Sequence, residues 1–178
     1  SGQGGGLFLY RTNSAIQLEN STVSGNAASA GRGGGIYLKG PFGGSHSLDV
    51  RSSTIASNTA SGSGGNIDGG NSANTIQLTN SIVSGGSAPS GPDIRSGAAT
   101  LTANFSLVQN TSDATIGGAS NQLGVDPQLA VLSSNGGSTQ AHLIGSSSPA
   151  LNAGTAAGLP ATDQRGLSRN VGAGPDMG

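Results

Sequence analysis

Apolar and polar residues alternate in a short stretch that recurs four times along the first 110 residues. In its first copy, residues 16–26, Ile16 and Leu18 are each followed by a polar residue, Gln17 and Glu19. This period of two predicts a β-strand with one buried face, and the Asn-Ser pair that comes next predicts a bend. No helical periodicity is present over residues 1–110. The copies begin at Ile16, Leu48, Ile76 and Leu101.

The spacing of the copies predicts a solenoid. They begin 32, 28 and 25 residues apart, within the range of about 20 to 50 residues that is typical of such arrays. Stacked coils place equivalent residues about 4.8 Å apart, so each column should be chemically uniform. We therefore predict an all-β fold, a right-handed single-stranded parallel β-helix with about four coils and a C-terminal closing region. The predicted interior columns are Ile16, Leu48, Ile76 and Leu101; Leu18, Val50, Leu78 and Ala103; and Val23, Ile55, Val83 and Val108.

A glycine-rich segment leads into each coil. It is clear at residues 4–10 and 33–39 and degraded at 64–68 and 92–95. Phe8 and Tyr37 hold equivalent positions in the first two copies, so they should project outward on neighbouring coils. There they either pack against each other or offer a surface on which a sugar ring stacks.

Asparagines occupy the predicted bends. Asparagine tolerates left-handed backbone, and its amide can bond to the same residue one coil away. We expect structural ladders at Asn26 and Asn58 on one bend and at Asn20 and Asn80 on the other, interrupted by Gly86 and Ser52.

The repeat fades beyond residue 110. We assign residues 1–110 to the coils of the β-helix and residues 111–178 to a closing coil and cap of the same domain. Within the cap, Ser148, Pro149 and Gly154 have the order of an N-cap, a first helical residue and a C-terminal glycine, which predicts a single helical turn. We expect this turn to cover part of the bore, the apolar interior that the coils enclose. An open solenoid end would expose apolar side chains and unpaired strand edges.

Composition narrows the functional classes. The 178 residues include 33 glycines, only 8% charged residues and a net charge of −1, with seven scattered Lys and Arg residues. Such a chain lacks the basic stripe that nucleic acids or anionic membranes require. The absence of cysteine excludes disulfides and thiolate metal sites. No apolar run approaches the roughly 20 residues of a membrane span.

Catalytic chemistry is weakly supported. Parallel β-helices commonly act on acidic polysaccharides through carboxylates stacked on adjacent coils, but the column containing Asp49 reads Gln17, Asp49, Gln77 and Thr102. Asp68, Asp93 and Arg95 form the best catalytic constellation, and structural pairing explains them more simply. We predict no catalytic residue, no metal site and no cofactor, leaving only surface Ca²⁺ open.

The closing region contains a series of short motifs in a fixed order. They occupy residues 125–129, 135–139, 141–143, 148–154 and 162–166, and their characteristic residues are Asp126, Pro127, Pro149, Asp163 and Arg165. In this order and spacing the region resembles the bacterial choice-of-anchor Q domain proteins, whose right-handed parallel β-helices precede a variable cell-surface sorting signal. The resemblance implies an extracellular or bacterial cell-surface location, and it implies that Asp163 and Arg165 tie the last segment to the solenoid.

Three functions are compatible with these features. The first is a non-catalytic extracellular structural or adhesive module, expected to be a fragment of a longer chain or a subunit of an assembly. The alternatives are a fragment of a polysaccharide lyase or glycoside hydrolase, and a carbohydrate-binding module. Expected partners are other protein subunits at the open N-terminal coil, residues 1–10, and glycans, but not nucleic acid.

Overall fold

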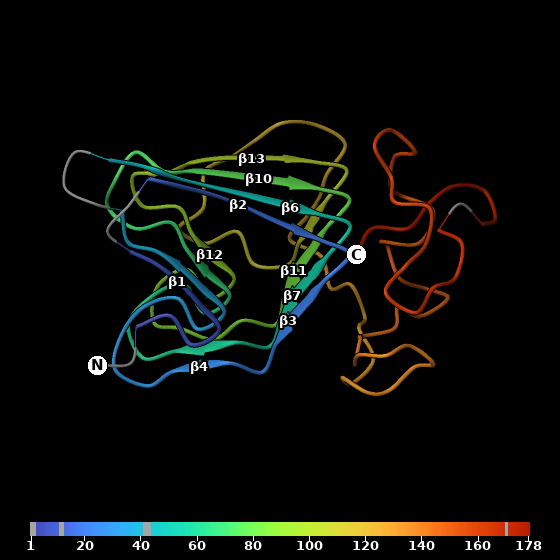
Figure 1. Ribbon diagram of the computed structural model, residues 1–178, viewed down its shortest axis with the longest axis horizontal. Helices are drawn as coiled ribbons and strands as arrows, with labels where there is room; N and C mark the ends of the chain where they lie inside the picture. Colours follow the sequence, from blue (N-terminus) through green and yellow to red (C-terminus); the bar gives the residue numbers. More distant parts are fainter. Residues whose placement is uncertain (1–2, 11–12, 41–43, 170) are drawn as a thin grey trace.

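The chain folds into a right-handed parallel β-helix, as the repeat predicts (Figure 1). The computed structural model describes residues 3–10, 13–40, 44–169 and 171–178. Within these ranges all regular structure is β-strand, and every pairing between named strands is parallel. Each of the first four coils adds one strand to each of three sheets, and a last coil extends two of them, so the sheets run along the solenoid.

The three sheets form the walls of the solenoid. Sheet A contains β1 (Leu7–Leu9), β5 (Ile36–Leu38), β9 (Ile67–Asp68) and β12 (Ile94–Arg95). Sheet B contains β2 (Ser14–Glu19), β6 (His46–Arg51), β10 (Thr75–Thr79), β13 (Thr100–Asn104) and β15 (Ile116–Gly117). Sheet C contains β3 (Thr22–Ser24), β7 (Thr54–Ala56), β11 (Ile82–Ser84), β14 (Leu107–Val108) and β16 (Gln122–Leu123). A small fourth sheet pairs β4 (Ala27–Ala28) with β8 (Thr59–Ala60).

Strand register places the predicted apolar columns in the bore. In sheet B, Ile76 pairs with Leu48 and with Leu101, and in sheet C, Val83 pairs with Ile55 and with Val108. The column members of the second, third and fourth coils are at most 2% exposed. Burial of such side chains stabilises the fold by about 1.5–3 kcal/mol each.

The first coil forms an open edge. Its strands β1, β2 and β3 each lie at the end of a sheet and pair with one neighbour only. Ile16, Leu18 and Val23 are consequently only half-buried, although their equivalents one coil away are fully buried. What covers this edge stays a prediction.

A buried amide ladder follows one corner of the solenoid. Asn26 Nδ2 donates to Asn58 Oδ1 at 3.0 Å, and Asn58 Nδ2 donates to Asn66 Oδ1 at 2.8 Å. Asn66 Nδ2 in turn donates to Asp93 Oδ1 at 2.8 Å. The ladder therefore continues beyond the two asparagines that the repeat indicates, and it ends on a carboxylate.

Glycine lets the ladder change sides at this corner. A Cβ on Gly35 would lie 2.9 Å from Asn58 Nδ2, whereas a Cβ on Gly86 would lie 2.8 Å from Asn66 Nδ2. In the second coil, the ladder amide therefore belongs to Asn58, at the bend after sheet C. In the third coil it belongs to Asn66, in the glycine-rich segment that leads into sheet A. Gly86 does not interrupt the ladder, because the side chain of Asn66 occupies the space that Gly86 leaves.

The other bend carries no amide ladder. Asn20 and Asn80 adopt left-handed φ values of 53° and 49°, as expected for asparagine at a bend. Their amides, however, bond to the closing region: Asn80 Nδ2 donates to the Thr155 carbonyl at 2.8 Å, and Asn20 Nδ2 donates to the Thr162 carbonyl at 3.2 Å. Ser52 separates the two asparagines along the column, so their amides bond to another segment instead of to each other.

Serines form an additional ladder beside this bend. The backbone N–H of Ser21 donates to Ser53 Oγ at 3.0 Å, that of Ser53 to Ser81 Oγ at 3.4 Å, and that of Ser81 to Ser106 Oγ at 3.1 Å. These bonds satisfy backbone donors that the turn would otherwise leave buried and unpaired.

Residues 111–124 continue the solenoid with β15 and β16, whereas residues 125–178 pack on its side and not over its open end. Figure 1 shows the latter residues, in orange and red, beside β3, β7 and β11 of sheet C. Ile82 and Leu107 project from this sheet's outer face and are fully buried with Ala150 and Met177. The predicted cover of the bore is therefore wrong: these outward apolar residues direct the segment to the wall.

The predicted helical turn near Ser148 is also wrong. The Leu151 N–H donates to the Ser148 carbonyl at 3.1 Å, and Ser148 Oγ accepts from the Ala150 N–H at 3.1 Å, which defines an isolated turn. Asn152 then has a left-handed φ of 54°. Left-handed backbone at this position ends the turn before a helix can propagate.

Candidate functional site

The outer face of sheet A carries a column of aromatic and charged side chains. Phe8 pairs with Tyr37, Tyr37 with Asp68, and Asp68 with Arg95, so the four residues follow one another on adjacent coils. Parallel in-register pairing brings together residues that are far apart in sequence. The column is therefore aromatic at its N-terminal end and ionic at the other.

The aromatic end is a stack of three rings. The Phe8 and Tyr37 centroids lie 5.4 Å apart with 15° between their planes, and the Phe8 and Tyr10 centroids lie 5.6 Å apart with 6° between their planes. Lys39 Nζ sits 4.5 Å from the centroid of the Tyr10 ring, a cation–π arrangement. Phe8 and Tyr10 are 42% and 43% exposed, whereas Tyr37 is buried. Burial raises the pKa of the Tyr37 hydroxyl, and the nearby Arg32 guanidinium opposes this shift.

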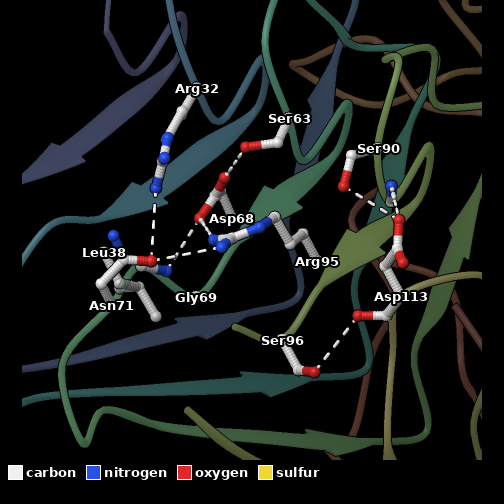
Figure 2. Close-up of polar contacts among 12 residues, drawn as sticks. Arg32, Leu38, Ser63, Asp68, Gly69, Asn71, Ser90, Arg95, Ser96 and Asp113 are labelled. Carbon is white, nitrogen blue, oxygen red and sulfur yellow. Dashed lines mark hydrogen bonds and ion pairs between the residues drawn. The ribbon is translucent and has the colours of Figure 1, made fainter. Parts of the chain in front are cut away.

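The ionic end is centred on Asp68, which is fully buried (Figure 2). Its carboxylate accepts hydrogen bonds from Ser63 Oγ, from the Gly70 N–H at 2.8 Å and from Arg95 Nη1 at 3.2 Å. Each carboxylate oxygen thus already has a donor. A carboxylate held in this way joins adjacent coils.

Two guanidinium groups converge beside this carboxylate. Arg95 Nη2 and Arg32 Nη1 both donate to Asn71 Oδ1, at 3.2 and 3.4 Å. The side chain of Arg95 keeps 22% of its surface exposed. Since Asp68 neutralises only one of the two cations, the cluster carries a net positive charge that an anionic ligand could complement.

Asp93 does not belong to this cluster. Although it lies two residues before Arg95, its carboxylate is buried in the amide ladder, where it also accepts from the backbone N–H groups of Gly86 and Asn110, both at 2.7 Å. Burial raises its pKa above the ordinary value, and the three hydrogen bonds oppose that shift. The structure thus brings Asp68 and Arg95 together and places Asp93 apart from them.

In the closing region, Asp163 and Arg165 shape a local turn. Their side chains form an ion pair at 2.6 Å, and Asp163 Oδ1 accepts from the backbone N–H groups of Arg165 and Leu167. Burial would raise the pKa of Asp163, but the hydrogen bonds from Arg165 and Leu167 outweigh it and lower the pKa. The intervening Gln164 makes the direct bond to the solenoid, accepting from Thr22 Oγ1 at 2.7 Å.

Arg169 also joins the closing region to the solenoid, although the sequence motifs do not indicate it. Its Nη2 donates to Asn20 Oδ1 at 2.6 Å and to the Ser52 carbonyl at 2.9 Å. Its Nη1 donates to the Gly178 carbonyl at 2.8 Å. Burial lowers the pKa of Arg169, and the carboxylate of Asp163 opposes the shift.

The remaining motif residues have local structural contacts. Asp126 Oδ1 accepts from the Gln128 N–H at 2.8 Å, and the Pro127 carbonyl accepts from Ser148 Oγ at 2.6 Å. Pro149 lies within the turn that follows Ser148. These contacts hold the closing region together.

A hollow of about 690 Å³ separates this region from sheet C. On one side it is lined by aliphatic residues that remain exposed, among them Leu143, Leu151 and Leu167, and on another by Arg165. His142 lies between this hollow and a second one of about 230 Å³.

His142 contacts Ser24 across this boundary. Its Nε2 lies 2.8 Å from Ser24 Oγ, and its Nδ1 lies 2.7 Å from the Ala130 carbonyl oxygen. The two residues are 118 positions apart, and no sequence motif links them. Only the lateral packing of the closing region brings them together.

Over the described ranges, no group of three or more His, Asp or Glu side chains is arranged to hold a metal ion. The same residues include no helix long and apolar enough to cross a membrane. Comparison with known proteins found no matching family model, no matching curated protein and no matching solved structure.

Proposed function

We propose that the chain is a structural or adhesive β-helix module of a bacterial cell-surface or secreted protein, in which the solenoid serves as a rigid spacer with contact faces. One observation carries this proposal: the acidic residues best suited to glycan cleavage, Asp68 and Asp93, are buried and hold coils to one another. The location rests on the resemblance of the closing region to choice-of-anchor Q domains.

Sheet B supplies a contact face with little charge. Its outward positions are small or neutral over much of the sheet, and Gln17, Thr75, Gln77 and Thr100 are exposed. The conspicuous charges, Asp49 and Arg51, are paired at 2.7 Å. A surface of this kind favours broad, weak contact over recognition of a single charged group.

A cleavage assay tests whether the chain cleaves acidic glycans, which a structural or adhesive module should not do. Purified chain incubated with polygalacturonate and alginate, with and without Ca²⁺, should release neither unsaturated products nor new reducing ends. The reason is that Asp68 and Asp93 are buried, where a polysaccharide does not reach them, and their carboxylates bond to neighbouring coils. Cleavage that disappears in Asp68→Asn would establish the lyase alternative instead.

A glycan-binding role is the second candidate, favoured by the exposed Phe8 and Tyr10 rings next to the net positive Arg32, Asp68 and Arg95 cluster. Aromatic rings stack on sugar faces, and guanidinium groups bind carboxylates. An anionic oligosaccharide would lie along the column of sheet A.

The Phe8→Ala variant tests this role. We expect it to bind oligogalacturonate about fivefold more weakly, because one aromatic contact contributes about 1 kcal/mol. Titration calorimetry provides the measurement. Val131→Ala, at an 82% exposed aliphatic position of the closing region, is the matched control and should leave binding unchanged. Equal affinity in Phe8→Ala and wild type would exclude this face as the binding site.

A further inference from the structure

The hydrogen bonds of His142 fix the position of its proton. The Ala130 carbonyl can only accept, so His142 Nδ1, 2.7 Å away, carries the hydrogen in the neutral ring. Nε2 is then an acceptor, and the hydroxyl of Ser24, at 2.8 Å, donates to it. The ring is therefore in the tautomer that can take a proton from serine.

We propose that Ser24 is a nucleophile activated by His142, and that its substrates are small carboxylic esters. A hydroxyl bonded to a histidine whose other nitrogen is held by a third group is the arrangement that activates serine. Here the third group is the Ala130 carbonyl, which orients the ring. This activity goes beyond a structural role of the solenoid.

Ser24 contacts a histidine that lines both hollows, although Ser24 itself lines neither of the two. Ser24 is partly exposed, and a Cβ on the following residue, Gly25, would meet no atom within 4 Å, so the chain is open on that side. The Gly25 N–H donates to the Ala56 carbonyl at 3.4 Å. The hollow that His142 borders presents the exposed aliphatic side chains of Leu143 and Leu151 to the organic part of an ester.

The dyad is specific to one coil. Ser24 shares its column in sheet C with Ala56 and Ser84. Ala56 has no hydroxyl, and Ser84 is buried. Only the first of these three positions combines a partly exposed hydroxyl with a histidine base.

The reaction balances with water as the second reactant. Ser24 Oγ bonds to the ester carbonyl carbon while its proton moves to His142 Nε2. The ester C–O bond then breaks, and the leaving alkoxide takes the proton from Nε2, which leaves an acyl-serine and an alcohol. Water attacks the acyl-serine, giving its proton to Nε2 and its oxygen to the acid, and Ser24 recovers its proton.

Labelling with a fluorophosphonate tests the proposal on the whole chain. Ser24 Oγ should form a bond to phosphorus as fluoride leaves, and peptide mapping by mass spectrometry should place the label on Ser24. The label should be absent in Ser24→Ala, and labelling should be about 100-fold slower in His142→Gln, because that variant lacks the base. Ser112→Ala, which removes an exposed serine that lines neither hollow, should label at the wild-type rate.

A second measurement separates catalysis from a role in holding the closing region. Wild-type chain should release p-nitrophenol from p-nitrophenyl acetate and carry an acetyl group on Ser24. Free imidazole should restore labelling of Ser24 in His142→Ala, which a lost structural contact would not allow. An unlabelled Ser24 in folded wild-type chain, or equal labelling rates in wild type and His142→Gln, would overturn the proposal.

Discussion

Asp93→Ala should lower the free energy of unfolding by about 3–5 kcal/mol, because it leaves three hydrogen-bond donors without their acceptor and each unsatisfied buried group costs about 1–3 kcal/mol. In the wild type its carboxylate accepts from Asn66 Nδ2 and from the backbone N–H groups of Gly86 and Asn110. Alanine leaves these donors facing a cavity. Urea denaturation of both chains at neutral pH measures the difference, and a change below about 1 kcal/mol would show that the end of the ladder contributes little.

Asp93→Asn is the matched control. Its Oδ1 can still accept from Asn66 and Gly86, while its Nδ2 faces the Asn110 N–H, so it should destabilise less than alanine. It should also alter the pH dependence of stability. Because burial raises the folded pKa of Asp93 above its ordinary value of 3.8, the wild type loses stability as pH rises from that value through the folded pKa. The asparagine variant should lack this loss.

His46→Leu should make the protein more resistant to acid. The imidazole is 1% exposed, and neither ring nitrogen has a hydrogen-bond partner in the part of the chain that the structure describes. Leucine would fill an interior position of β6 next to Leu48 without a buried polar group. Relief of the unsatisfied nitrogens alone should stabilise the fold by about 1–3 kcal/mol.

The stability that His46→Leu gains over the wild type should increase as the pH falls. Burial lowers the folded pKa of His46 below 6.5. The wild type therefore keeps its full stability with respect to this group above pH 6.5 and loses stability as the pH falls from 6.5 towards the folded pKa. The loss approaches about 1.4 kcal/mol per pH unit. Thermal unfolding of both chains from neutral to mildly acidic pH measures it. Parallel curves for wild type and His46→Leu would contradict the assignment.

The coils could be predicted because the alternation of side chains along a strand and the stacking of equivalent residues together determine which positions are buried. A period of two buries Ile76 and Leu78 together, and a fixed stacking distance aligns them with Leu48 and Val50. The ladder could be predicted only in part, since Asn66 lies in the glycine-rich approach and not at the bend where Asn58 lies. Asparagine and glycine exchange places between the second and third coils. This pattern indicates one continuous ladder only when both positions are known to face the same corner of the solenoid.

The closing region could not be placed from its pattern, because it has turns and isolated bridges instead of a repeat. One clue was present on sheet C. The outward column changes from Thr22 and Thr54 to Ile82 and Leu107, and apolar residues at outward positions need a cover. The Ser24 and His142 pair had no such clue, since it depends on that packing. The family resemblance itself stays a prediction.

The corner ladder also sets a compatibility rule for joining the second and third coils. In these two coils the corner has room for one side chain, which comes either from the bend, as at Asn58 with Gly35, or from the glycine-rich approach, as at Asn66 with Gly86. A coil of this kind with asparagine at both places would overfill the corner, and one with glycine at both would leave the neighbouring amides without partners. Duplicated copies of these two coils should therefore stack on one another, provided that each brings one amide to the corner.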